Sequence, residues 1–162
     1  MRIDLGNDLS LETATDADLE YVHTHLRQGD MVEHSFDSKK ADTVANLPGV
    51  MAIRYGEKLI GYIGYMPPPL ESMFSKARVV YYLSTVHANE TKLTYVKRTP
   101  EVFRAIVATM PDWVEDILTV SMPEDYPMAC KWLEKILGFK GVRDFKWRGS
   151  VHRLYIKNRK EI

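Results

Sequence analysis

The sequence predicts a single α/β domain in which a mixed central sheet is flanked by helices on both faces. Its 162 residues show strand and helix periodicities in the order β-α-α-β-β-β-α-β-α-β-β. Helices separate the strands near both ends of the chain and three strands follow one another in the middle, which calls for a sheet with parallel and antiparallel neighbours. Hydrophobic residues make up 45% and charged residues 27% of the chain, as in an ordinary globular protein. No repeat, linker or low-complexity segment divides residues 1–162, so we expect one domain.

The first predicted helix has a clear start signal. A short strand is expected at residues 10–14, and Thr15 with Asp18 three residues later has the spacing of a capping box. Apolar residues then recur at helical spacing, and Gly29 is expected to end the helix. A second helix is expected from about residue 37 to 46.

Three strands are expected to follow without a helix between them. Residues 50–55 and 59–66 read as two strands joined by a tight turn. Residues 78–87 are rich in β-branched and aromatic side chains and predict the third strand. Gly61 and Gly64 lie inside the second strand, where glycine indicates a bulge or the close approach of another segment.

Helical spacing returns in the C-terminal half. Thr99 as N-cap and Pro100 at the first helical position predict a helix that starts at residue 99. A strand is expected at residues 115–122, followed by a helix that opens at Pro123. Gly138 is placed to end that helix as a left-handed C-cap.

The chain is predicted to end in a hairpin with strands at residues 143–148 and 151–156 and a turn at residues 149–150. Basic residues crowd this region: Arg143, Lys146, Arg148, Arg153, Lys157, Arg159 and Lys160. We interpret them as a solvated sheet edge, where charge discourages the addition of another strand. Because the formal net charge of the whole chain is zero, no specific nucleic-acid partner is expected.

Cysteine and histidine give no sign of a metal site. Cys130 is the single cysteine and falls in an apolar helical pattern, which predicts a small core residue. The five histidines lack the spacing of metal ligands. The N-terminus lacks the pattern of a signal peptide and no run reaches the roughly 18 apolar residues of a membrane span. We therefore expect a cytoplasmic protein.

The segment Ala129–Phe139, which ends in Leu137-Gly138-Phe139, resembles the last helix of the GNAT acyltransferase superfamily, and the element order matches that fold. The resemblance implies acetyl-CoA bound at a splayed pair of central strands, here residues 78–87 and 115–122. In active members the turn after the first strand carries Gln/Arg-x-x-Gly-x-Gly/Ala. Residues 87–99 contain no glycine, and Glu90 is expected where the phosphates would lie. The sequence thus predicts that no cofactor binds.

The alternative is an active N-acetyltransferase with an atypical cofactor loop. In that case Lys92, Lys97 and Arg98 would bind the phosphates of acetyl-CoA by their side chains. His87 would be the base and Tyr126 the acid. The tyrosine that family members often place four residues before the helix-ending glycine is replaced here by Glu134.

The retained last helix and the lost turn resemble a subset of GNAT-like proteins, the small internal virion or assembly-associated proteins of short-tailed bacteriophages. This resemblance implies a non-catalytic protein that works through contacts with virion or host proteins, in the virion interior or the host cytoplasm. A toxin-like or host-modulating factor is a further alternative. The predicted protein-binding loop consists of Pro67, Pro68, Pro69, Leu70, Met73 and Phe74.

Overall fold

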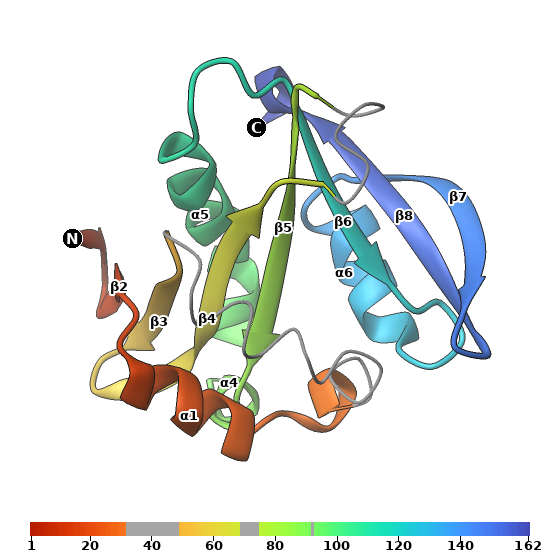
Figure 1. Ribbon diagram of the computed structural model, residues 1–162. Helices are drawn as coiled ribbons and strands as arrows, with labels where there is room; N and C mark the ends of the chain where they lie inside the picture. Colours follow the sequence, from red (N-terminus) through yellow and green to blue (C-terminus); the bar gives the residue numbers. More distant parts are fainter. Residues whose placement is uncertain (32–48, 69–74, 92) are drawn as a thin grey trace. The chain divides into compact units, whose positions relative to one another are not determined.

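The computed structural model describes residues 1–31, 49–68, 75–91 and 93–162 (Figure 1). Within these ranges, eight strands are hydrogen-bonded in the order β1-β2-β3-β4-β5-β6-β8-β7. The strands are β1 Arg2–Gly6, β2 Leu9–Thr13, β3 Met51–Tyr55, β4 Lys58–Met66, β5 Ala77–Ser84, β6 Asp116–Ser121, β7 Lys140–Trp147 and β8 Ser150–Asn158. The helices are α1 Asp16–Thr24, α4 His87–Glu90, α5 Leu93–Ala108, α6 Pro127–Lys135 and the 3-10 turn η1 Arg159–Glu161. None of the described helices is long and apolar enough to cross a membrane.

The sheet is mixed, as the sequence predicts. β5 and β6 run parallel, because the chain passes through α5 between them. β1, β2, β3 and β4 pair antiparallel in succession, and β8 pairs antiparallel with both β6 and β7. The predicted α/β class with helices beside a mixed sheet is therefore confirmed.

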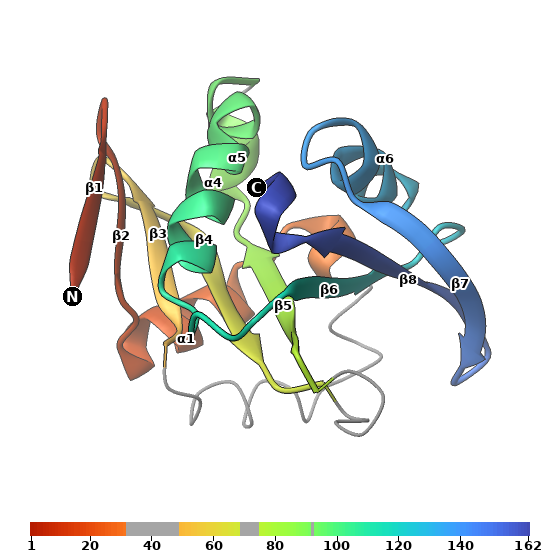
Figure 2. The same ribbon diagram turned by 90° about the horizontal axis from the view of Figure 1, so that it is seen from above.

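By its internal packing the chain divides into two compact units. Unit 1 comprises Met1–Gly64 and Tyr81–Thr109, and unit 2 comprises Tyr65–Val80 and Met110–Ile162. In unit 1, α1 and α5 lie on opposite faces of the strands (Figure 2). The largest fully buried side chains of unit 1 are Leu9, Leu11, Val22, Met51, Ile53, Ile60, Tyr62 and Ile106. Those of unit 2 are Ile117, Leu118, Met122 and Tyr155.

Several predicted boundaries are confirmed by local stereochemistry. The Thr15 hydroxyl accepts the Asp18 N–H at 3.2 Å, and the Asp18 carboxylate accepts the Thr15 N–H at 3.0 Å, which completes the capping box of α1. Gly138 has φ +71° after α6. A Cβ on Gly61 would lie 2.1 Å from the carbonyl oxygen of Leu83, and one on Gly64 would lie 2.2 Å from the Tyr81 hydroxyl. Both glycines therefore permit close approach of β5.

Other boundaries differ from the prediction. β1 is an additional strand that the sequence did not predict. α1 ends at Thr24 and not at Gly29, and β5 ends at Ser84, so that His87 lies in the short helix α4. α6 begins at Pro127 and not at Pro123. The turn of the hairpin consists of residues 148–149 and not 149–150. Both residues have a positive φ (48° and 81°), as this kind of two-residue turn requires. The helix predicted at residues 37–46 lies outside the described residues.

The largest correction concerns α5, which begins at Leu93, so that Pro100 lies inside it. Proline has no N–H to give to the carbonyl four residues earlier, here that of Val96. The Thr99 hydroxyl donates to the Val96 carbonyl at 2.7 Å and supplies the missing hydrogen bond. The Thr99-Pro100 pair thus continues a helix where the sequence signals predicted a start.

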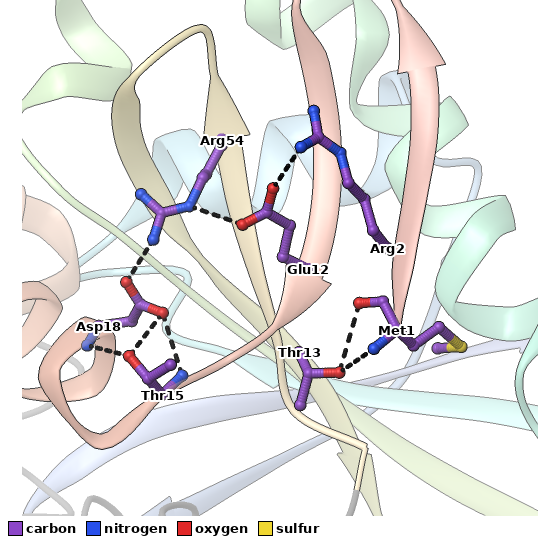
Figure 3. A network of polar contacts seen from close by, with 7 residues as sticks. All are labelled: Met1, Arg2, Glu12, Thr13, Thr15, Asp18 and Arg54. Atoms are coloured by element: carbon purple, nitrogen blue, oxygen red, sulfur yellow. Dashed lines mark hydrogen bonds and ion pairs between the residues drawn. The ribbon is translucent and has the colours of Figure 1, made fainter.

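A polar network joins β1, β2, β3 and the start of α1 (Figure 3). Arg54 on β3 donates to Glu12 at 3.1 Å through Nε and to Asp18 at 2.6 Å through Nη2. Arg2 on β1 pairs with the other oxygen of Glu12 at 3.2 Å. Arg54 is partly buried and Arg2 is largely exposed, so the two arginines contribute differently to stability.

We predict that Thr99→Val lowers the free energy of unfolding by about 1–3 kcal/mol, because the Val96 carbonyl loses its donor. In a Pro100→Ala background the same change should have less than half that effect, since the new backbone N–H at position 100 then reaches Val96. Urea unfolding of the four proteins of this double-mutant cycle measures the coupling. Equal effects in both backgrounds would show that the hydroxyl does not replace the proline's missing donor.

We further predict that Arg54→Met lowers the free energy of unfolding by about 1–3 kcal/mol, because the partly buried Asp18 loses its cation. Arg2→Met removes the same kind of group from an exposed pair and should change it by less than about 0.5 kcal/mol. The same urea titrations measure both, and an equal loss would contradict the assigned role of Arg54.

Candidate functional site

The described polar residues that best suit proton transfer gather in unit 1 around the turn that follows β5. Backbone hydrogen bonds fix this turn from two sides. The Thr85 N–H donates to the carbonyl of Ile60 at 2.7 Å, and the Val86 N–H donates to the carbonyl of His25 at 2.9 Å. The Arg27 N–H donates to the carbonyl of Ser84 at 3.0 Å. The segment after α1 is therefore held against the end of β5.

His87 lies between a phenol and a carboxylate. Its Nε2 is 2.7 Å from the Tyr21 hydroxyl, and its Nδ1 is 3.1 Å from the Glu90 carboxylate. The Tyr21 ring also stacks on His25, with ring centroids 3.9 Å apart. Which ring nitrogen carries the proton decides whether Tyr21 donates to Nε2 or accepts from it. Nδ1 lies within ion-pair distance of Glu90 but lacks the geometry of a hydrogen bond. Tyr21 and His87 thus form a hydrogen-bonded pair along which a proton can move, with the Glu90 carboxylate beside the ring.

Glu90 also pairs with Lys58, whose Nζ is 2.6 Å from the carboxylate. The hydrogen bond from Lys58, and next that from His87, lower the pKa of Glu90 below its ordinary value. The carboxylate is therefore ionised at neutral pH and its charge is balanced by Lys58. An isolated negative charge, as the sequence suggested for this turn, is not what the structure shows.

A buried carboxyl group lies behind the same turn. Asp30 is 2% exposed and accepts the Ser84 hydroxyl at 2.7 Å and the Arg27 Nε–H at 3.0 Å. Burial raises the pKa of Asp30, although Arg27 and Ser84 oppose that rise. The group ties residues 27–30 to the last residue of β5.

Tyrosines surround this carboxyl group in unit 1. Burial raises the pKa of Tyr82 to about 12 and raises that of Tyr95 well above its ordinary value. Burial also raises the pKa of Tyr62, whose hydroxyl is 3.0 Å from Nε2 of His23. These phenols therefore stay protonated at neutral pH and serve as hydrogen-bonding groups rather than as bases.

The structure places the residues of the predicted cofactor and acid sites as follows. Lys97 is exposed on α5. The Arg98 guanidinium donates to the carbonyls of Leu5 (2.6 Å) and Gly6 (2.8 Å) and to Glu101. It therefore anchors β1 to α5, and a phosphate would have to compete with these contacts. Lys92 lies outside the described residues. Tyr126 is buried in unit 2 at the N-cap of α6.

Of the predicted protein-binding loop, the structure describes Pro67, which is exposed, and Pro68, which is buried. Pro69, Leu70, Met73 and Phe74 lie outside the described residues. Within the described ranges, no group of His, Cys, Asp or Glu side chains could hold a metal ion. Glu134, which stands where family members often carry a tyrosine, accepts the Tyr155 hydroxyl at 3.1 Å.

Sequence reasoning selected His87 but missed its partners Tyr21 and Glu90, as well as Asp30. The three-residue spacing of His87 and Glu90 could have been recognised if this segment had been predicted as helix rather than strand. Tyr21 is 66 residues away from His87, and no local pattern signals that contact.

The chain resembles known proteins in structure but not detectably in sequence. No family model matches the sequence, and no curated sequence is detectably similar. The aminoglycoside acetyltransferase AAC(6′)-Ib in complex with ribostamycin and coenzyme A superposes with a TM-score of 0.69 at 16% identity, covering 94% of each chain. Spermidine N-acetyltransferase from Vibrio cholerae with CoA and spermine gives 0.64 at 11% identity, covering 96% of this chain and 98% of that one. NAA60 from Arabidopsis thaliana with acetyl-CoA gives 0.60 at 14% identity, covering 94% and 99%.

The chain has the GNAT acetyltransferase fold. The expectation that no cofactor binds is wrong, because these neighbours with the GNAT fold are solved with coenzyme A or acetyl-CoA. That expectation assumed that only glycine residues leave backbone N–H groups available to bind the phosphates of the cofactor. The first N–H groups of a helix can also lack intrahelical partners. At α4 the N–H groups of His87, Ala88 and Asn89 already donate to Thr85 and Val86, so the start of α5 is the helix end that remains as a source of such amides. The second argument, an opposing charge at Glu90, fails because Lys58 balances it.

We predict that the stability of the protein falls as pH rises through the folded-state pKa of Asp30. This pKa is raised by burial, so the contribution of Asp30 is fully present below the unfolded-state pKa and is lost above the folded one. Between these two pKa values, the free energy of unfolding of the wild type should fall by up to about 1.4 kcal/mol per pH unit relative to that of Asp30→Asn, whose side chain does not titrate. Urea unfolding of both proteins from pH 3.5 upward (a range of about four units) measures this difference. A constant difference would contradict it.

Proposed function

We propose that the protein is an acetyl-CoA-dependent N-acyltransferase that transfers an acetyl group to a primary amine. The observation that supports this most is the likeness to acetyltransferases over at least 94% of this chain and of each neighbour, in structures that contain coenzyme A or acetyl-CoA. The acceptors printed for two of those proteins, ribostamycin and spermine, are both amines. The acceptor of this protein is not identified by that likeness.

The residues near the turn after β5 suit an anionic ligand. Lys58 balances Glu90, so this turn has no uncompensated acidic side chain among its described residues. Lys97 is exposed on the second turn of α5, where its ammonium group is accessible to a phosphate. Lys97 is therefore our candidate for a phosphate contact, together with Lys92, whereas Arg98 is occupied by β1 and Glu101.

Acetyl-CoA supplies an acetyl group activated as a thioester. An attacking amine forms the new C–N bond, the C–S bond breaks, and one proton must leave the nitrogen. Tyr21 is placed to accept that proton on its oxygen while its own proton passes to Nε2 of His87. Glu90 lies beside Nδ1 and stabilises the imidazolium that forms. The departing thiolate can take up its proton from solvent.

The non-catalytic role in phage assembly gains no support from the structural neighbours, which are acetyltransferases. They favour the enzymatic alternative.

We predict that acetyl-CoA binds in a saturable way in titration calorimetry. At about 100 times its dissociation constant it should raise the melting temperature by about 5–10 °C. Lys97→Ala should weaken binding about 3- to 10-fold through the loss of one phosphate contact. Lys131→Ala, which removes an exposed lysine from α6, is the matched control and should bind as wild type does. The absence of heat and of a thermal shift at millimolar acetyl-CoA would overturn the proposal.

We also predict that the proton-transfer chain controls kcat. With acetyl-CoA and a panel of amines (spermidine, kanamycin and peptides with free N-termini), thiol release reports turnover. His87→Gln should lower kcat about 10²- to 10⁴-fold. Glu90→Gln should lower kcat while KM for acetyl-CoA changes little, because Glu90 acts through His87. Glu57→Gln, the same change in an exposed turn, is the control. Unchanged kcat in His87→Gln would remove His87 from the mechanism.

A further inference from the structure

The outer strand of unit 2 is unusual for a sheet edge. β7 ends the strand order, as Figure 1 shows beside β8. Each of its eight residues is exposed. It nevertheless carries large apolar side chains: Val142 is 55% exposed, Phe145 37% and Trp147 39%. A long edge strand with exposed aromatic residues pairs readily with another strand unless something covers it.

The backbone of β7 restricts how another strand can add to it. Trp147 and Ser150 flank the two-residue turn and form a hydrogen-bonded pair, so residues 143, 145 and 147 direct their N–H and C=O groups to β8. Asp144 and Lys146 therefore direct theirs outward. A second β7 that adds antiparallel is related to the first by a twofold axis. Residues whose N–H and C=O groups point outward must then lie opposite outward-pointing residues of the other copy. This requires the axis to pass through a residue and not between two residues.

The charges of β7 favour one such residue. With the axis at Phe145, Asp144 faces Lys146 of the other copy twice, and Arg143 faces Trp147 twice, where cation–π contact is possible. An axis at Asp144 or Lys146 places like charges opposite each other. An axis at Arg143 opposes two arginines, and one at Trp147 opposes Lys146 and Arg148. The bulge between Gly141 and Arg143 breaks the alternation that an axis at Val142 would need.

We propose that β7 is a self-association surface at which two copies of this chain pair antiparallel about Phe145. This goes beyond the acetyltransferase proposal and does not depend on it. It also revises the interpretation of the hairpin as an edge protected by basic residues. Asp144 balances Arg153 at 2.7 Å within the chain, so the strand carries alternating rather than uniform charge. Phe145 and Trp147 both lie against His152, with ring centroids 5.6 and 5.5 Å away, and of the two only Phe145 would face its own counterpart across the axis.

Sedimentation equilibrium over about 1–200 µM protein tests the association, a range suited to the small area that one strand pair buries. We expect a monomer–dimer equilibrium that Lys146→Asp weakens about tenfold, because it places two acidic pairs across the axis. The double variant Asp144→Lys/Lys146→Asp should restore association. Lys140→Asp makes the same charge change outside the paired segment and should have little effect. A monomer throughout this range would overturn the proposal.

Disulfide trapping tests the register without charge changes. In a Cys130→Ala background, which removes the single cysteine, Phe145→Cys should form a disulfide-linked dimer under mild oxidation. Residues opposite each other in a non-hydrogen-bonded antiparallel pair lie about 4.5 Å apart at Cα, within disulfide reach. Lys146→Cys should not, because diagonal positions lie about 7–8 Å apart. A dimer that links through residue 146 but not 145 would overturn the proposed register.

Discussion

The hydrogen bonds at Ser84, Thr85 and Val86 hold together the part of unit 1 on which the proposed chemistry depends. They attach the end of β5 to β4 on one side and to the residues after α1 on the other. Backbone N–H groups make three of these bonds, and the hydroxyls of Ser84 and Thr85 make three more, so the attachment depends on both kinds of group. It brings the C-terminal part of α1 to the start of α4, so that Tyr21 meets His87 although the two are distant in sequence.

Asp30 strengthens the same attachment, although burying its ionisable carboxyl group costs free energy. Its carboxyl accepts two donors on one oxygen, from Arg27 and from Ser84, and so links side chains where the backbone already pairs. An apolar residue could fill the space but could not hold Arg27 and Ser84 in fixed directions. The neighbouring phenols of Tyr62, Tyr82 and Tyr95 stay protonated, so Arg27 is the charged group that faces this carboxyl.

The sequence predicted features that depend on a few neighbouring residues. The capping box at Thr15 and Asp18, the left-handed Gly138 and the close approaches at Gly61 and Gly64 follow from local stereochemistry. The Thr99-Pro100 pair misled because the same two residues either start a helix or continue one, and the choice depends on which donor reaches Val96. Contacts such as Tyr21 with His87 arise from the topology of the sheet, so no local pattern reveals them.

The interruption at Pro100 has a consequence for the motions of α5. Where one N–H is missing and a side chain replaces it, the helix has a weak link in its hydrogen-bond ladder. The residues after it, Val102, Phe103, Ile106 and Val107, are buried in the core of unit 1, whereas Leu93, Thr94 and Lys97 before it are exposed. Tyr95 and Thr99, also before the proline, are buried, so the first turns are held against the same core despite the missing hydrogen bond. Local opening of these turns therefore has to expose both side chains. A ligand that reaches the start of α5 would meet its exposed face, with Leu93, Thr94 and Lys97.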